Sequence, residues 1–359
     1  MAISLTTPPE AEAAELTAWV AEAIGLPVTT VERIGGGRNS RVLRVVCGRG
    51  RSYVVKQYFA PRVDARSRLE VEFDALTFLW GRGIRDIPQP IAADRERGAA
   101  VYAAIDGAPI AAAEVGDAEI EQAVGFLAAL KALRTDPASG ALPPASEACF
   151  STRAVLDNLE LRLRRFPDRR GRGTPYGALA DFLAREFSPA RDRVTHWCQE
   201  RLSAFGRSLE SELPQRHRTL SPSDFGFHNG LRLADGRITY LDFEYFGWDD
   251  PAKILADFVL HPAMGLSERV GRQFAARVFA LFSDDQELPV RAEAAFPLVG
   301  LKWCLILLNE FVPDDLSRRA FAGRTAAAQT EALQRAQLAK ARRMLRRILS
   351  TYEQFPYRT

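Results

Sequence analysis

The sequence predicts an α+β protein of two lobes, a small antiparallel sheet with a helix followed by a larger, mainly helical part. Short runs rich in β-branched residues crowd the first 105 residues, whereas segments with helical spacing fill most of the remainder. Between them, Asp106-Gly107-Ala108-Pro109 interrupts both patterns. We therefore expect an N-terminal lobe over residues 1–105 and a C-terminal lobe over residues 106–359.

The first lobe should open with a helix, because Pro8-Pro9 precedes apolar residues three or four apart and Gly25 follows them. Three strands come next, the last two joined by a turn at Gly48-Arg49-Gly50. A second helix and a strand pair ending near residue 105 complete the lobe. The expected ranges are helices 8–24 and 63–80 and strands 28–34, 41–47 and 52–59.

Beyond residue 106 the pattern is helical, with a loop rich in Pro, Gly and Ser over residues 136–146. One hairpin interrupts it, with strands 231–233 and 238–242 around an Asp235-Gly236 turn. Helices resume at Pro251 and continue to the C-terminus. The helices expected before the hairpin cover residues 117–133, 152–166, 176–186 and 192–213.

Composition describes an ordinary globular protein of 359 residues. A net charge of +3 gives no indication of a nucleic-acid partner. There is no secretory signal pattern, and we expect no integral membrane segment, because no uninterrupted apolar run approaches about 20 residues. Four scattered cysteines without Cys-x-x-Cys spacing favour reduced thiols, and hence a cytoplasmic location. Protein partners are not predicted.

A glycine-rich turn between the first two predicted strands is a candidate phosphate cradle. Glycines let backbone N–H groups approach phosphate oxygens, and Asn39 and Ser40 add donors. An ordinary hairpin turn explains the same residues, and the segment is neither a Walker loop nor a dinucleotide fingerprint. The candidate nucleotide-binding residues here are Gly35, Gly36, Gly37, Asn39 and Ser40.

Lys56 is a second candidate for nucleotide binding. Alternation places it on one face of its strand with Val54, and a lysine on a buried face needs an anionic partner. The α- and β-phosphates of a nucleotide would serve, with Glu72 on the next helix holding the lysine. Glu70 competes for that role, and an exposed edge lysine is the plain alternative.

The segment Ser223-Asp224-Phe225-Gly226-Phe227-His228-Asn229, with Asp242 at the end of the following hairpin, carries the clearest functional signal. Asp224 would orient an acceptor hydroxyl and accept its proton. Asn229 and Asp242 would supply oxygen ligands to Mg²⁺. Phosphoryl transfer needs mainly positioning and charge neutralisation, which these groups provide. Each carboxylate alone could be an ordinary surface residue, but their order and spacing favour a small-molecule kinase.

On these motifs the chain resembles the aminoglycoside phosphotransferase and choline kinase superfamily, which has a protein-kinase-like fold. Asp224 and Asn229 match its catalytic loop, and Leu241-Asp242-Phe243 with Asp250-Pro251 match its metal segment. The resemblance implies ATP or GTP as donor and a hinge at Ala103 to Ile105 that binds the base. Two positions depart from the pattern. Pro222 replaces the loop histidine, for which Ser221, Ser223 or His228 could substitute, and Ile254 replaces an aspartate, with Asp257 one turn later.

The acceptor is less clearly indicated. Carboxylates beside aromatic rings suit a sugar, an aminosugar or an amino alcohol. Basic runs around Arg162 and Arg343 suit solvated faces, an anionic acceptor or an acidic membrane surface. Trp303, on a later helix, is a further aromatic residue that could line this site, and a core-facing helical stripe is the favoured alternative for it. The expected function is a Mg²⁺-dependent small-molecule kinase, and the alternative is a nucleotide-binding pseudokinase that regulates a partner. The candidate acceptor-binding residues are Glu244, Trp248, Asp249 and Glu310.

Overall fold

The computed structural model describes residues 10–34, 40–59, 67–167, 174–313 and 327–358. Within them the chain forms two compact units, which are described separately below. The first contains the described residues up to Ala108 together with residues 231–245, and the second contains residues 109–230, 246–313 and 327–358. The sequence pattern assigns residues 231–245 to the second lobe instead. They lie in the first unit because the strand that ends at Tyr240 is hydrogen-bonded to that unit. The Tyr240 N–H donates to the Asp86 carbonyl at 2.8 Å.

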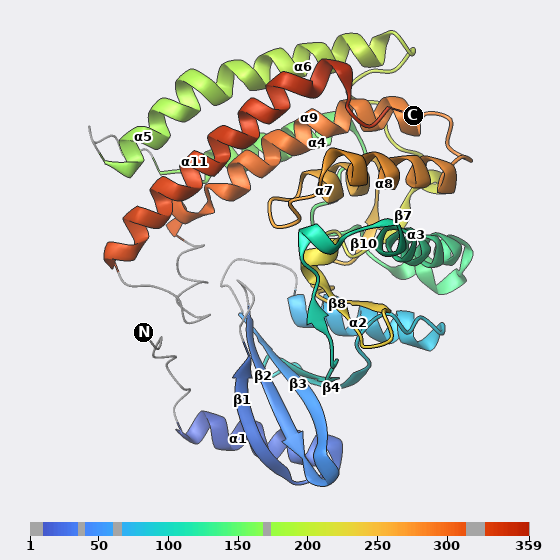
Figure 1. Ribbon diagram of the computed structural model, residues 1–359, viewed down its shortest axis with the longest axis vertical. Helices are drawn as coiled ribbons and strands as arrows, with labels where there is room; N and C mark the ends of the chain where they lie inside the picture. The colour runs from blue at the N-terminus through green and yellow to red at the C-terminus, as the bar shows by residue number, and fades with distance from the viewer. Residues whose placement is uncertain (1–9, 35–39, 60–66, 168–173, 314–326, 359) are drawn as a thin grey trace. The chain divides into compact units, whose positions relative to one another are not determined.

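The first unit is built on a five-stranded antiparallel sheet in the order β1-β2-β3-β5-β4 (Figure 1). Its strands are rich in Val, Ile and Tyr, which favour a pleated, half-buried surface. The strands are β1 (Val28–Ile34), β2 (Ser40–Cys47), β3 (Arg51–Tyr58), β4 (Pro90–Asp94) and β5 (Ala99–Ala103).

Two helices pack on this sheet. Helix α1 (Glu10–Ile24) buries Leu16 and Val20 in a cluster with Val55 of β3. Because successive side chains of a strand point to opposite faces, Lys56 points away from the α1 side. Helix α2 (Arg68–Gly81) begins at Ser67, whose hydroxyl accepts from the Glu70 N–H at 3.3 Å. Residues 63–66 of the expected helix 63–80 lie outside the described residues.

A second, three-stranded sheet contains β6 (Ala108–Pro109), β8 (Gly230–Arg232) and β9 (Ile238–Tyr240), in the order β6-β8-β9. The β8–β9 hairpin appears where the sequence predicts it, around Asp235-Gly236. Its second strand ends at Tyr240, two residues before Asp242. Asp242 therefore belongs to the irregular segment after the hairpin, where side chains have more freedom of direction.

Helices dominate the second unit, and α9 lies at its centre. In Figure 1 it runs beside α11, and it also packs against α4, α6 and α7. Leu298, Leu301 and Leu305 of α9 are fully buried. The helices are α3 (Asp117–Ala132), α4 (Thr152–Arg164), α5 (Pro175–Phe182), α6 (Ser188–Ser203), α7 (Pro251–Leu260), α8 (Glu268–Leu281), α9 (Leu288–Leu307) and α11 (Ala327–Thr351).

Two features of this unit differ from expectation. The helix expected over 192–213 ends at Ser203, because Gly206 adopts φ +68° and stops it. A strand pair, β7 (Thr219–Ser221) with β10 (Gly247–Asp249), is absent from the expected elements, since three-residue strands are too short to show alternation. Gly247 lets the segment of residues 143–145 lie close to the other side of β10, because a Cβ there would lie 2.4 Å from the Pro143 carbonyl oxygen.

Residues Leu288–Phe311 form a helical stretch long and apolar enough to cross a membrane, in contrast to the expectation that no segment approaches this length. Within the described residues, however, 72% of its most apolar window is buried inside the protein. A helix enclosed by α4, α6, α7 and α11 is already covered by its own unit. Its apolar character is that of a core helix.

Candidate active site

Lys56 lies at the centre of a buried ionic cluster in the first unit. Its Nζ is 2.6 Å from Glu72 Oε2 and 2.8 Å from Asp242 Oδ1, and Glu244 Oε2 is 3.9 Å away. Glu70, the competing partner in the sequence, instead pairs with Arg95 at 3.2 Å on an exposed face. A lysine held by three carboxylates is a fixed positive charge rather than a mobile surface group.

Burial by itself would lower the pKa of Lys56, but the charges of Asp242, Glu72 and Glu244 raise it well above its usual value. The ammonium therefore stays charged at any physiological pH. Burial raises the pKa of Glu244 to about 7, and the charge of Asp242 adds to the shift while that of Lys56 opposes it. Burial also raises the pKa of Glu72, so both of these carboxylates hold a proton more readily than an exposed glutamate does.

Further hydrogen bonds fix the Glu72 carboxylate. The Tyr58 hydroxyl donates to its Oε2 at 2.8 Å, and the Tyr58 and Tyr102 hydroxyls are 2.7 Å apart. The Phe243 N–H donates to its other oxygen, Oε1, at 3.3 Å. Because Phe243 adjoins Asp242, Glu72 ties helix α2 to the segment that carries the candidate metal ligand.

Asp242 has a backbone φ of +66°, a left-handed conformation that costs energy for any residue with a Cβ. Its side chain is 33% exposed, whereas those of Lys56 and Glu72 are nearly enclosed. Oxygen atoms of Glu72, Asp242 and Glu244 lie within 4.8 Å of one another. Hard carboxylate oxygens fit Mg²⁺, and Asp242 is the most open of the three.

Asp224 lies in the second unit, in the loop that follows β7. His228 Nε2 is 3.0 Å from its Oδ1, and His261 Nε2 is 3.4 Å from the same oxygen. The preceding residue, Ser223, has a left-handed φ of +68°. Two imidazoles and a strained backbone therefore define where this carboxylate lies.

Burial alone would raise the pKa of Asp224. The hydrogen bond from His228 and the charge of His228 are the largest effects that outweigh burial, and they hold the pKa of Asp224 well below its usual range. Asp224 is therefore ionised at neutral pH. A carboxylate of low pKa is a weak base, which suits a group that orients a hydroxyl more than one that fully removes its proton early.

The two histidines could in principle join Asp224 as metal ligands, because their ligand atoms lie within 4.8 Å of one another. Their rings, however, are stacked face to face, with centroids 3.7 Å apart and planes 9° from parallel. Nitrogen lone pairs lie in the ring plane, so parallel stacked rings do not converge on one ion. The Ala263 N–H also donates to His261 Nδ1 at 3.2 Å, which leaves the His261 proton on Nε2, facing Asp224. The geometry favours a hydrogen-bonded clamp.

Asn229, the other candidate metal ligand, donates from Nδ2 to the Asp224 backbone carbonyl at 3.0 Å. That bond fixes the orientation of the Asn229 side-chain amide, with its NH₂ group facing the carbonyl. The side-chain oxygen is then the atom that can accept an ion. Asn229 belongs to the second unit and Asp242 to the first.

The remaining nucleotide-binding candidates are less well described. Gly35, Gly36, Gly37 and Asn39 lie outside the described residues. Ser40 begins β2 and is buried. At the expected hinge, the Ala103 N–H already donates to the Gln89 carbonyl at 2.9 Å, so this donor is used within the sheet. Ile105 follows β5 and is half-buried.

All four acceptor-binding candidates are enclosed. Glu244 and Glu310 are 3% and 2% exposed. The Trp248 indole N–H donates to the Ser139 carbonyl at 3.1 Å, and Asp249 is fully buried against Lys253 at 2.8 Å. In this structure these side chains serve their own unit's packing and ion pairs.

Three residues near Asp224 have no signal in the sequence or a misleading one. His261 lies 37 positions after Asp224 and has no motif around it. Lys253, in the first turn of α7, has its Nζ 3.3 Å from the Ser223 hydroxyl. Trp303 is expected in the core, but it is half-buried and its ring meets the edge of His261 at 4.4 Å between centroids. The helical stripe containing Trp303 conceals this contact.

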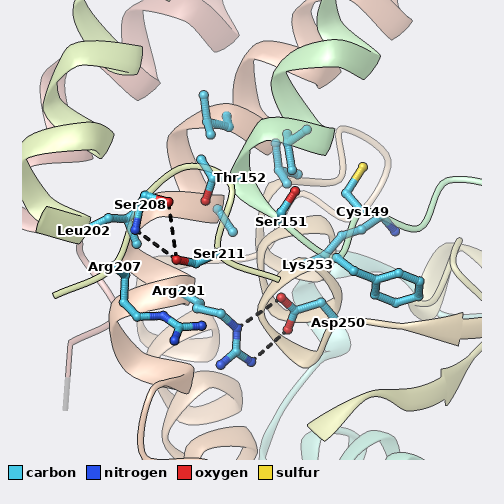
Figure 2. Close-up of a pocket in the computed structure, with 15 residues that line it drawn as sticks. Cys149, Ser151, Thr152, Leu202, Arg207, Ser208, Ser211, Asp250, Lys253 and Arg291 are labelled. Carbon is cyan, nitrogen blue, oxygen red and sulfur yellow. Dashed lines mark hydrogen bonds and ion pairs between the residues drawn. The ribbon is translucent and has the colours of Figure 1, made fainter. Parts of the chain in front are cut away.

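A pocket in the second unit lies beside Lys253 and is shown in Figure 2. It is walled by apolar side chains and by hydroxyls of Ser151 and Thr152. Its Arg291 is held by Asp250 at 3.1 Å and by Asp285 at 2.7 Å. The other two cations that line it are also paired, Arg207 with Glu287 at 3.3 Å and Lys253 with Asp249 at 2.8 Å. Among the described residues that line the pocket, each cation therefore already has a carboxylate partner. Its cavity volume, about 30 Å³, is room for very small molecules only.

The sequence matches the family described as the phosphotransferase enzyme family over residues 30–296. That range covers most of the chain and includes Lys56, Asp224 and Asp242, so the resemblance seen in the motifs is confirmed. Comparison with curated proteins found no match.

Several solved structures share the fold. A spectinomycin phosphotransferase, in complex with ADP and spectinomycin, has a TM-score of 0.65 at 14% identity and covers 95% of this chain and 98% of its own. A choline kinase from Cryptosporidium parvum has a TM-score of 0.57 at 10% identity, covering 96% and 100%. A Plasmodium vivax ethanolamine kinase has a TM-score of 0.53 at 13% identity, covering 87% and 81%.

These identities are low, so the structural likeness establishes a fold, the two-lobed kinase-like α+β fold that the sequence predicts. The activity is established by the match to the family model. The chain belongs to the phosphotransferase enzyme family, and it is a small-molecule phosphotransferase that takes an alcohol group as acceptor.

Proposed function

We propose that this protein is a Mg²⁺-dependent kinase that transfers the γ-phosphoryl group of ATP or GTP to a hydroxyl of a sugar, aminosugar or amino alcohol. The observation that carries the proposal is the ionic cluster of Lys56, Glu72 and Asp242 in a member of this family. A buried ammonium next to a partly open carboxylate is suited to phosphates and a metal ion at one place.

In the first unit, Lys56 would bind nucleotide phosphates while Glu72 fixes its direction. Asp242 would hold Mg²⁺, together with Asn229, through hard oxygen donors. The ion, when bound, supplies positive charge that neutralises the phosphate oxygens. The glycine-rich segment with Ser40, and the backbone near Ala103 and Ile105, would contact the rest of the nucleotide. Since the Ala103 N–H is used in the sheet, its carbonyl and the Ile105 backbone are the groups left for the base.

In the second unit, Asp224 would accept a hydrogen bond from the acceptor hydroxyl and align its oxygen for attack. His228 and His261 keep the carboxylate ionised and restrict its rotation. The hydroxyl proton passes to Asp224 late in the transfer, when the oxygen has begun to bond to phosphorus and become acidic. This assignment needs no strong base, in agreement with the low pKa.

The acceptor class rests on two supports. Solved structures with this fold include a spectinomycin complex and choline and ethanolamine kinases. In addition, the half-buried Trp303 beside His261 is an aromatic group of the kind that stacks on a sugar or an alkylammonium group. Because Trp248, Asp249 and Glu310 are enclosed, we assign them supporting roles in the second unit rather than direct contact with the acceptor.

The test is release of ADP or GDP in the presence of Mg²⁺ and pooled acceptors: neutral sugars, aminosugars, amino alcohols and nucleosides. Nucleotide binding is measured in parallel by titration calorimetry. Release of ADP or GDP that depends on an acceptor supports kinase activity and identifies the pool that contains the acceptor. Tight Mg²⁺–nucleotide binding with no release from any pool would instead favour the pseudokinase, for which Pro222 in place of the loop histidine is the relevant departure.

A further inference from the structure

A charge-balanced quartet lies directly behind the Asp224 loop. It consists of Lys253, Asp249, Asp257 and Lys302, whose side chains are 0–7% exposed. Lys253 Nζ lies 2.8 Å from Asp249 and 3.0 Å from Asp257, and Lys302 Nζ lies 3.1 Å from Asp257. Two carboxylates and two ammonium groups cancel in charge. Buried ion pairs of this kind add little net stability compared with apolar packing, so their position calls for another explanation.

One arm of the quartet reaches the backbone beside Asp224. Lys253 Nζ donates to the Ser223 hydroxyl at 3.3 Å. Ser223 holds the left-handed φ of +68°, and its N–H donates to the Ser221 hydroxyl at 2.9 Å. A strained conformation persists only where its surroundings enforce it. The lysine therefore helps to hold the residue that sets the direction of Asp224.

The other arm reaches the Asp224 carboxylate itself. The Trp303 indole N–H donates to Asp257 Oδ1 at 3.0 Å. The ring of His261 meets that of Trp303 edge to face, at 83°. His261 Nε2 then faces Asp224 Oδ1 at 3.4 Å, with its tautomer set by the Ala263 N–H.

We propose that Asp257 is the positioning residue of the catalytic loop, acting on Asp224 through Lys253 and Ser223 on one side and through Trp303 and His261 on the other. The inference rests on the proposed role of Asp224. It also accounts for the two departures from the family pattern, because a lysine–aspartate pair supports a loop in which Pro222 and Ile254 provide no polar group.

The test compares steady-state kinetics of Asp257→Asn, Ser223→Ala and Trp303→Phe. Asparagine keeps the shape of Asp257 but removes its charge, and the other two variants each remove one hydrogen bond. We expect kcat to fall roughly 10- to 100-fold in Asp257→Asn, because small misplacements of reacting groups have effects of this size. The KM for the nucleotide should stay within about 2-fold, since the phosphate-binding lysine is not touched.

Double-mutant cycles separate positioning from general destabilisation. Trp303→Phe should reduce kcat by several-fold in the wild type and by much less in the Asp257→Asn background, because its partner is already impaired. In the double variant of Ser223→Ala and Trp303→Phe, the factors by which the two substitutions lower kcat should instead multiply, since the two residues lie on different arms. The control is Glu293→Gln, which removes a buried carboxylate paired with Arg201 in the same unit, and it should lower the melting temperature while keeping kcat.

The outcomes are distinct. If Asp257→Asn keeps kcat within about 2-fold, or if Asp257→Asn and Trp303→Phe act independently, the positioning role is wrong. If Asp257→Asn fails to fold, the proposal is tested by Ser223→Ala, Trp303→Phe and the double-mutant cycle between them. An unchanged kcat in both single variants would overturn the proposal. If Asp224→Asn itself keeps full turnover, the proposed function fails first, whatever the result at Asp257.

Discussion

The ammonium of Lys56 lies 2.6 Å from the carboxylate of Glu72, and Glu70, two residues earlier, pairs with the exposed Arg95. This difference makes a matched pair of variants. Glu72→Gln should lower kcat/KM for the nucleotide roughly 10- to 100-fold, because Lys56 loses the group that directs it. Glu70→Gln should leave both kinetics and stability nearly unchanged, since exposed pairs contribute about 0–1 kcal/mol. Equal effects in the two variants would refute the assignment of Glu72.

Asp242 provides a test of metal binding in which the backbone is preserved. Asn tolerates positive φ better than most residues, so Asp242→Asn keeps the left-handed turn at φ +66° while removing the charge. We expect the Mg²⁺ concentration for half-maximal activity to rise at least about 10-fold, the size of effect seen even for outer partners of metal ligands. The measurement is a Mg²⁺ titration at saturating nucleotide. An unchanged midpoint would show that Asp242 is not a ligand.

Gly226 tests whether the position of His228 matters. A Cβ on Gly226 would lie 2.8 Å from His228 Nδ1 and 2.8 Å from Met264 Sδ, so Gly226→Ala must displace one of them. We expect a stability loss of about 1–3 kcal/mol and a kcat about 10-fold lower.

Gly125 in α3 is the matched control for that substitution, because a Cβ there meets no atom within 4 Å. Gly125→Ala should raise stability by up to about 1 kcal/mol and leave kcat unchanged. Thermal denaturation and initial rates check both variants. A Gly226→Ala protein that is destabilised but fully active would show that the displacement at Gly226 does not disturb the Asp224 carboxylate.

Glu244 should make stability depend on pH. Its pKa of about 7 in the folded protein exceeds the value of about 4.3 expected in the unfolded chain. Between these pH values the folded protein holds a proton on Glu244 that the unfolded chain has released. The stability contributed by this proton is therefore complete below about pH 4 and is lost as the pH rises through 7. Glu244→Gln has no such proton. We compare the free energies of unfolding of the two proteins, measured with denaturant. The value for Glu244→Gln minus the value for the wild type should rise by on the order of 2 kcal/mol from about pH 5 to about pH 8. Parallel pH curves for both proteins would contradict this.

Local patterns are sufficient to predict much of the fold. Alternation in β3 and helical spacing in α2 indicate both partners of the Lys56–Glu72 pair from the amino-acid sequence alone. The hairpin around Asp235-Gly236 is also predictable, because its turn residues have a strong local signal.

What the sequence does not reveal depends on contacts between distant segments. His261 reaches Asp224 because β7 pairs with β10, and three-residue strands leave no periodic trace. Trp303 fits a core stripe and yet lies against His261, since one helical position can serve both packing and a site. Lys253 has the sequence context of an ordinary helix residue, and only its buried surroundings show that it holds Ser223.

The most direct test of the central claim is turnover by Asp224→Asn, measured beside the wild type with Mg²⁺, nucleotide and the acceptor pool that supports activity. Nucleotide binding and melting temperature are recorded on the same samples. We predict that acceptor-dependent phosphorylation falls by at least about 100-fold while nucleotide binding is retained, because the variant loses only the group that orients the hydroxyl. Phosphorylation at the wild-type rate in Asp224→Asn would contradict the account.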